Sequence, residues 1–174
     1  MKSLKIGLDL DDCIFEFMSL YLKRFGTPKD DYEITHNVRK FLTQDKDFWL
    51  NQPIINRPDF IPTLYCTKRV HNKRWTKEQL IINELPLASI YQVRLQSTNK
   101  ATRIKGLVDV FVDDSISNMI AMNLSGLPCL LLDSPYNQEW GPIGRIYSVT
   151  RDEIEDIYYL FKNTIFPNFK ELVK

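Results

Sequence analysis

The chain has few of the residues that hold small proteins together through disulfides or zinc. Its three cysteines, Cys13, Cys66 and Cys129, are far apart and match neither a disulfide framework nor a zinc-site spacing. Its two histidines, His36 and His71, also lie outside any metal spacing, and we expect both at the surface. Cys66 and Cys129 lie in or beside apolar runs, so we expect buried free thiols and a reducing compartment.

Long apolar runs and an excess of one charge are also missing. No stretch is long enough to span a bilayer, and the N-terminus leads into a strand-like segment without a signal peptide, so we expect a cytoplasmic protein. The 23 basic and 22 acidic residues leave a net charge of +1, which gives no general electrostatic reason to expect a nucleic-acid coat protein or a membrane-surface protein. The length of 174 residues suits one buried core with a small insertion.

The most informative segment is an apolar run, residues 4–8, that ends in carboxylates at Asp9, Asp11 and Asp12. Apolar runs of this length are typical of buried parallel strands. Open α/β sheets bind their ligands at the carboxyl ends of such strands, where these acids would lie. A simpler interpretation of the segment alone is a capped strand followed by an acidic turn.

The same pattern returns about a hundred residues later, where residues 107–112 are strand-like and are followed by Asp113 and Asp114. If the two strands are parallel neighbours, their carboxylates converge and repel one another. A hard divalent cation relieves that repulsion, and Mg²⁺ favours a few carboxylates together with water and substrate phosphate. The two strand ends therefore predict a Mg²⁺ site and a phosphate-bearing substrate.

Strand-like and helix-like segments alternate along the rest of the chain. The expected strands are 61–66, 90–95, 107–112, 128–132 and 143–149, and the expected helices are 14–25, 76–84, 100–105, 116–124 and 152–161. Such alternation predicts βαβ units and a three-layer, Rossmann-like, doubly wound parallel sheet of the α/β class. We expect residues 27–56 to form a small helical cap insertion in a core domain made of 1–26 and 57–174.

Two more turns at the carboxyl edge of the predicted sheet offer chemistry. Thr67 follows the second strand, and Lys100 opens the helix that follows the third strand. Lys105 lies a turn and a half later, near the opposite edge, and is expected to be a solvated surface charge. A cation, a hydroxyl, several acids and a metal suit phosphoryl transfer, in which positioning and charge neutralisation dominate.

These turns resemble the motifs of the haloacid-dehalogenase-like (HAD) phosphatase superfamily. The matching residues, in the expected order, are Asp9-Leu10-Asp11, Thr67, Lys100 and Asp113-Asp114. The resemblance spans roughly residues 4 to 134. The chain departs from the pattern at Asp12, where many members carry Gly, at Cys13, where Thr or Val is common, and at Asn118, where Asp is frequent.

The resemblance implies a catalytic role for each matching residue. Asp9 would attack phosphorus and become an aspartyl phosphate, while Asp11 would protonate the leaving alcohol and later take a proton from water. Thr67 would donate a hydrogen bond to a phosphoryl oxygen, and Lys100 would offset negative charge. The implied Mg²⁺ ligands are Asp9, the backbone carbonyl of Asp11, and Asp114, with Asp113 in the outer shell.

Within that superfamily the chain is most similar to the 5'(3')-deoxyribonucleotidases. Phe17 lies eight residues past Asp9, where members of that family place an aromatic ring against the nucleobase. Thr67-Lys68-Arg69 and the later segment Leu132 to Asn137, followed by Arg145, are similar to other parts of the family. This resemblance implies (deoxy)nucleoside monophosphates as substrates.

Several interpretations stay open at this point. Phe48 and Trp49 could stack on a base or could simply pack the insertion onto the core. Lys68 or Arg69 could contact the phosphate, or the basic run 68–75 could guide a nucleic-acid strand or form a solvated loop. The candidate functions are a nucleotidase, a phosphatase acting on phosphorylated DNA or RNA ends, and a non-catalytic relative that binds phosphate-bearing partners. The intact set of motif residues argues against the last.

Overall fold

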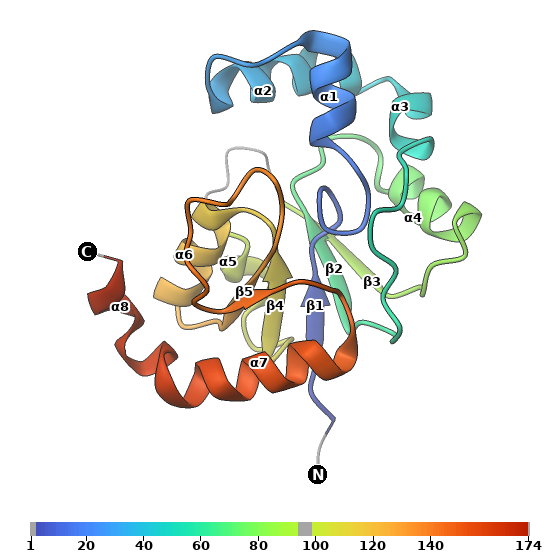
Figure 1. Ribbon diagram of the computed structural model, residues 1–174. Helices are drawn as coiled ribbons and strands as arrows, with labels where there is room; N and C mark the ends of the chain where they lie inside the picture. The colour runs from blue at the N-terminus through green and yellow to red at the C-terminus, as the bar shows by residue number, and fades with distance from the viewer. Residues whose placement is uncertain (1–2, 94–98, 174) are drawn as a thin grey trace.

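Six short strands, most of them apolar, pair in parallel to form the central sheet (Figure 1). The computed structural model describes residues 3–93 and 99–173. The strands are β1 (Ile6–Leu8), β2 (Leu64–Thr67), β3 (Ser89–Gln92), β4 (Val110–Asp113), β5 (Cys129–Leu132) and β6 (Arg145–Ile146). Their order in the sheet is β3-β2-β1-β4-β5-β6, which confirms the Rossmann-like, doubly wound α/β fold expected from the sequence.

β1 lies between β2 and β4, and a glycine makes this packing possible. Gly7 is opposite Leu64 on one side and Phe111 on the other. A Cβ atom at position 7 would lie 2.8 Å from the Phe111 ring, closer than side chains tolerate. The absence of a side chain at this position therefore lets a large ring fill the centre of the main core.

Helices follow the strands, and one of them has the predicted bounds. They are α1 (Met18–Phe25), α2 (Asp31–Asn37), a π-helical turn (Val38–Leu42), α3 (Lys46–Leu50), α4 (Lys73–Ile82), α5 (Ala101–Ile104), α6 (Ile116–Leu124), α7 (Arg151–Thr164), a 3₁₀ turn (Phe166–Asn168) and α8 (Phe169–Leu172). α6 matches its predicted range. α7 packs against β5 and β6 and crosses in front of the sheet in Figure 1.

Some predicted boundaries are wrong for reasons visible in the hydrogen bonds. The helix expected from Ile14 begins only at Met18, because the amides of Ile14 and Phe15 both donate to the Leu10 carbonyl, at 2.8 and 2.9 Å, in a tight loop after β1. The helix expected to open at residue 76 begins earlier, at Lys73. The end of the predicted strand 90–95 lies outside the described residues.

The helices between β1 and β2 share an apolar cluster of their own. Its buried members are Phe17, Tyr21, Val38, Leu42 and Trp49, separate from the main core under the sheet. Figure 1 shows α1, α2 and α3 gathered beyond the carboxyl ends of the strands. α1 therefore packs with the segment predicted as an insertion at 27–56, and the division into a core and a cap stays a prediction.

None of the helices in residues 3–93 and 99–173 combines the length and the apolar character needed to cross a membrane.

Candidate metal centre

The carboxyl ends of β1 and β4 carry the acidic residues of the candidate site. The two strands are parallel neighbours with Leu8 opposite Val112, so Asp9 and Asp113 leave the sheet side by side. Carboxylate oxygens of Asp9, Asp113 and Asp114 all lie within 4.8 Å of one another. The expectation that the two acidic strand ends converge is therefore confirmed.

Lys100 places one positive charge in this cluster. Its ammonium nitrogen lies 2.5 Å from an oxygen of Asp9 and 2.7 Å from an oxygen of Asp113, and the residue is only 1% exposed. Burial opposes the charge, but Asp113 and Asp9 together outweigh burial and hold the pKa of Lys100 well above its ordinary value. Lys105 is exposed, as predicted, and donates to the Ser125 carbonyl instead.

One ammonium group does not offset three clustered carboxylates. Burial raises the pKa of Asp9 to about 7 although Lys100 acts in the opposite direction. Burial, and then the neighbouring Asp113, hold the pKa of Asp114 well above its ordinary value. A hard divalent cation would favour the charged form of these groups, and a donor set made only of oxygens fits Mg²⁺. The residues present could therefore hold such an ion.

Asp113 and Asp114 differ in how many donors they already have. The donors to Asp113 are the Lys100 ammonium at 2.7 Å, the Ser115 amide at 3.0 Å and the Asn118 side chain at 3.0 Å. Within the described residues, the side chain of Asp114 accepts only from the Cys13 thiol, at 3.9 Å. The lone pairs of Asp114 are thus the more available for an ion, while Asp113 orients Lys100.

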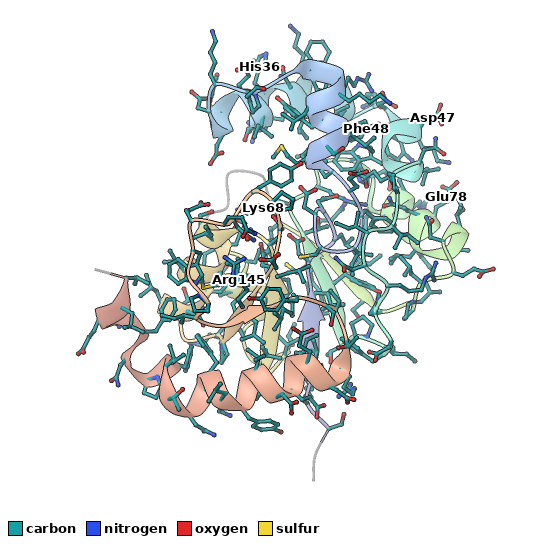
Figure 2. The ribbon with its side chains drawn as sticks, viewed as in Figure 1. His36, Asp47, Phe48, Lys68, Glu78 and Arg145 are labelled. Carbon is teal, nitrogen blue, oxygen red and sulfur yellow. The ribbon has the colours of Figure 1, made fainter. Side chains whose placement is uncertain are left out.

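The loop that carries Asp114 is anchored by Asn137, which the sequence analysis named only as part of the segment 132–137 and without this role. The Asn137 side chain donates to the backbone carbonyl of Asp114 and to that of Leu132, both at 2.8 Å. Arg145, which Figure 2 labels, donates to the Asn137 side chain at 2.8 Å and pairs with Asp133 at 2.5 Å. The segment around Asn137 therefore holds the end of β4 in place, through a hydrogen bond between residues 23 positions apart in the chain.

Asp11 lies outside the three-carboxylate cluster and faces Thr67. The Thr67 hydroxyl donates to Asp11 Oδ2 at 3.1 Å, which brings together the ends of β1 and β2. The guanidinium of Arg69 contacts Asp11 Oδ1 at 2.6 Å. The sequence left open whether Lys68 or Arg69 contacts the phosphate. The described hydrogen bonds of Arg69 are to this carboxylate and to the buried Gln79 and Gln52, and its contact with a phosphate stays a prediction.

Asn118 connects Lys68 to the acidic cluster. Its side-chain oxygen accepts from Lys68 at 2.6 Å, and its side-chain nitrogen donates to Asp113. An aspartate at position 118 could not donate to Asp113, so the amide is suited to a position between a cation and a carboxylate. Burial lowers the pKa of Lys68, and Figure 2 shows this residue between the helices beyond the strand ends and the sheet.

Trp49 and Phe17 are packed within the apolar cluster of the helices beyond the strand ends. Trp49 is 2% exposed, its ring stacks on Phe17 at 5.9 Å between centroids, and its Nε1 donates to the Leu42 carbonyl at 2.8 Å. Arg69 covers the Trp49 ring at 5.0 Å. A base would reach these rings only if the helices moved, and base stacking on Phe17 and Trp49 stays a prediction.

The structure places His71 against expectation, and it gives Asp12 a backbone conformation that the sequence analysis did not predict. His71 was expected at the surface but is buried between Trp49 and Trp75, and its Nδ1 bonds the Asn72 carbonyl at 2.9 Å. Asp12 has a φ of 57°, in the left-handed region that glycine adopts more readily than other residues. Its carboxylate accepts from the first amides of α1, which offsets the backbone strain.

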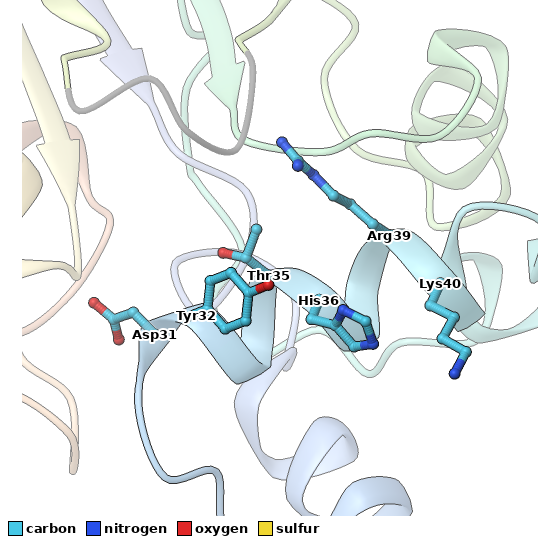
Figure 3. A pocket seen from close by; sticks show the side chains of 6 residues that line it. All are labelled: Asp31, Tyr32, Thr35, His36, Arg39 and Lys40. Carbon is cyan, nitrogen blue, oxygen red and sulfur yellow. The ribbon is translucent and has the colours of Figure 1, made fainter.

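A cavity of about 410 Å³ lies along α2 and the π-helical turn, away from the acidic cluster (Figure 3). It is lined by Asp31, Tyr32, Thr35, His36, Arg39 and Lys40. All six residues come from one helical segment, and none is a member of the acidic cluster. The cavity therefore does not mark the candidate site.

No family model, no curated protein and no solved structure matches the chain. The interpretation of the site therefore depends on its own geometry.

Proposed function

We propose that the protein is a Mg²⁺-dependent phosphomonoesterase that acts through an aspartyl-phosphate intermediate. The observation that carries the proposal is the cluster of Asp9, Asp113 and Asp114 at the joined ends of β1 and β4, with Lys100 between two of its members. Fixed positive charge beside clustered carboxylates is the arrangement that phosphoryl transfer requires. Asp9, the backbone carbonyl of Asp11, and Asp114 would hold the ion, which would neutralise charge on the phosphoryl oxygens.

The reaction assigns one task to each nearby side chain. An oxygen of Asp9 forms a bond to phosphorus as the bond from phosphorus to the leaving oxygen breaks, and Asp11 gives its proton to that oxygen. Asp11 then takes a proton from the water that hydrolyses the aspartyl phosphate. Thr67 donates to a phosphoryl oxygen, and Lys100 stabilises the charge on Asp9 and on the phosphate. The buried contact between Lys100 and Asp9, at 2.5 Å, supports this last role.

The substrate class that we favour is the (deoxy)nucleoside monophosphates. The resemblance of the first motif to the 5'(3')-deoxyribonucleotidases supports this choice. Lys68 also supports it, because this half-buried cation beside Asn118 lies where it could meet the charge of a bound phosphate. The pairing of Arg69 with Asp11 leaves Lys68 as the better candidate for such a contact.

A phosphorylated polynucleotide end is the second candidate, supported by basic charge near β3. Lys73, Arg74, Lys77 and Arg103 are exposed and line two cavities, of about 330 and 510 Å³, beside this edge strand. Among the described residues none of the four forms an ion pair, so their charges are available to phosphates along a strand. Affinity for such a substrate would fall steeply as salt rises, whereas a monophosphate would respond mildly.

A phosphate-release screen tests the proposal. The purified protein is incubated with ribo- and deoxynucleoside monophosphates and with phosphorylated oligonucleotides, with Mg²⁺ and with excess chelator. We expect release only with Mg²⁺, and release reduced to background in Asp9→Asn, while the exposed Asp156→Asn serves as a matched control with wild-type rates. In Asp114→Asn, the Mg²⁺ concentration for half-maximal rate should rise by about 10-fold or more.

The outcome of this screen can also reject the proposal. Release that continues unchanged in Asp9→Asn would exclude this residue as the nucleophile. A folded wild-type protein that releases phosphate from no substrate at any Mg²⁺ concentration would reject the phosphatase and favour a non-catalytic phosphate-binding protein.

A further inference from the structure

Arg69 is a fully enclosed guanidinium whose ionic partner is the carboxylate of Asp11. The residue is 3% exposed and lies two positions after the end of β2. Its Nε donates to Asp11 Oδ2 at 2.9 Å, and its Nη2 donates to Asp11 Oδ1 at 2.6 Å. Two parallel contacts of this kind fix the orientation of a carboxylate as well as its position.

Two buried glutamines hold the remaining edges of this guanidinium. Arg69 Nη1 donates to Gln79 Oε1 at 2.6 Å, and Arg69 Nη2 donates to Gln52 Oε1 at 2.9 Å. The glutamines also contact each other, at 3.0 Å. The rings of Trp49 and Phe15 lie 5.0 and 5.6 Å from the guanidinium carbon. We call Arg69, Gln52 and Gln79 the guanidinium clamp.

The clamp spans separate parts of the fold. Gln79 lies on α4, Gln52 follows α3, and Arg69 follows β2. Arginine keeps its charge even when it is buried, so the clamp carries a permanent positive charge that needs a partner. Within the described residues that partner is Asp11, which is held from its other side by the Thr67 hydroxyl at 3.1 Å. The direction of the Asp11 side chain is therefore decided by the clamp and not by the metal cluster.

From this arrangement we infer that Arg69 is a positioning residue for proton transfer by Asp11, and that Gln52 and Gln79 couple the packing of the helices beyond the strand ends to that step. The inference rests on the proposed phosphatase function, in which the Asp11 carboxylate takes a proton from the hydrolytic water of one turnover and gives it to the leaving oxygen of the next. It differs from the sequence-based expectation that Arg69 contacts the phosphate itself. A phosphate contact would act on substrate binding, whereas positioning of Asp11 acts on the turnover of substrates that need a proton.

The leaving group provides the test. A nucleoside monophosphate leaves as an alcohol that needs protonation, whereas p-nitrophenyl phosphate leaves as a stable anion that hardly does. In Arg69→Met, kcat for the nucleotide should fall by about 10²-fold or more, the contribution typical of general acid catalysis. kcat for p-nitrophenyl phosphate should fall by less than about 10-fold. KM for both substrates should stay within about twofold of wild type.

Further variants separate positioning from simple damage. Gln52→Leu keeps Arg69 but removes one clamp contact, so it should show the same leaving-group pattern to a smaller extent, and it serves as the test if Arg69→Met does not fold. Arg69→Lys keeps the charge but lacks the planar guanidinium that makes two parallel contacts with Asp11. It should recover only part of the nucleotide rate. In an Asp11→Asn background, Arg69→Met should cause no further loss. The exposed Arg39→Met, outside the acidic cluster and the basic surface near β3, is the matched control with wild-type rates.

Each contrary result has a distinct meaning. Equal losses for both esters in folded Arg69→Met and Gln52→Leu would show a structural role and overturn the inference. A rise in KM without a fall in kcat would assign Arg69 to the phosphate and also overturn it. If the wild-type protein hydrolyses neither ester, the proposed function itself is overturned. If the wild type is active, the variants test only the role of Arg69.

Discussion

Replacement of Lys100 by methionine should make the fold of this protein depend on magnesium. The lysine is the cation between Asp9 and Asp113, and its stem also lies by Phe111, with the ammonium 5.4 Å from the ring centroid. Methionine keeps the buried aliphatic volume but removes the charge. The variant would leave three clustered carboxylates, including Asp114, with no buried cation among them.

The size of the effect follows from this geometry. Removal of one partner from a buried ion pair costs about 3–5 kcal/mol, because the other charge stays buried without compensation. For a chain of this length each kcal/mol lowers the melting temperature by about 2–4 °C, so the shift should be about 6–20 °C. Mg²⁺ at 100 times its dissociation constant would restore about 2.7 kcal/mol, if it binds only the folded state.

Urea unfolding, followed by tryptophan fluorescence with and without Mg²⁺, measures the free energy of unfolding lost in the variant and the part that Mg²⁺ restores. Lys105→Met is the control, because this lysine is exposed and its loss should cost less than about 1 kcal/mol. The reasoning would be refuted if Lys100→Met cost no more than the control. It would also be refuted if Mg²⁺ stabilised the variant no more than it stabilises Lys105→Met.

Three further predictions concern buried residues that are not members of the acidic cluster. Burial lowers the pKa of His71 to about 4, so the folded state favours the neutral ring. The contribution of His71 to the free energy of unfolding is therefore complete above the unfolded pKa of about 6.5 and is lost as the pH falls towards 4. In urea titrations across this range His71→Phe should lose less stability than wild type, by on the order of 3 kcal/mol, and parallel curves would contradict this. Burial raises the pKa of Cys66 to about 12, and all three cysteines are buried, so a thiol reagent should label them only after denaturation, and rapid labelling of the native protein would be contrary. Gly7→Ala should cost about 1–3 kcal/mol in urea unfolding, because its Cβ would lie 2.8 Å from the Phe111 ring, and an unchanged midpoint would show that the ring can move.

Much of the fold could be predicted because its signals are local. Apolar runs that alternate with helix patterns predict a parallel sheet, and the bounds of α6 were predicted without error. The start of α1 was not, because the loop before it depends on the amides of Ile14 and Phe15 returning to Leu10 and on Phe15 bridging to Ile54. A bridge to a residue so far along the chain leaves no local pattern.

The acidic cluster and the guanidinium clamp show the same contrast within the site. Asp9 and Asp113 end apolar strands, and the parallel pairing of those strands was sufficient to bring their carboxylates together. Nothing near Arg69 in the sequence distinguishes a phosphate contact from an ion pair with Asp11, which lies 58 residues away. The sequence likewise left open whether Trp49 stacks on a base or packs the insertion onto the core; its described neighbours include Phe17 and Arg69, and base stacking stays a prediction.

The order of residues by itself determined that carboxylates, a hydroxyl and a lysine would meet at one edge of a parallel sheet, because strand ends are set by short-range hydrophobic patterns. Only the tertiary structure decided which cation each carboxylate faces: Lys100 for Asp9, and Arg69 for Asp11. The physical reason is that ion pairs form between side chains brought together by packing, and the packing around Arg69 depends on how α3 lies against α4 and α4 against β3.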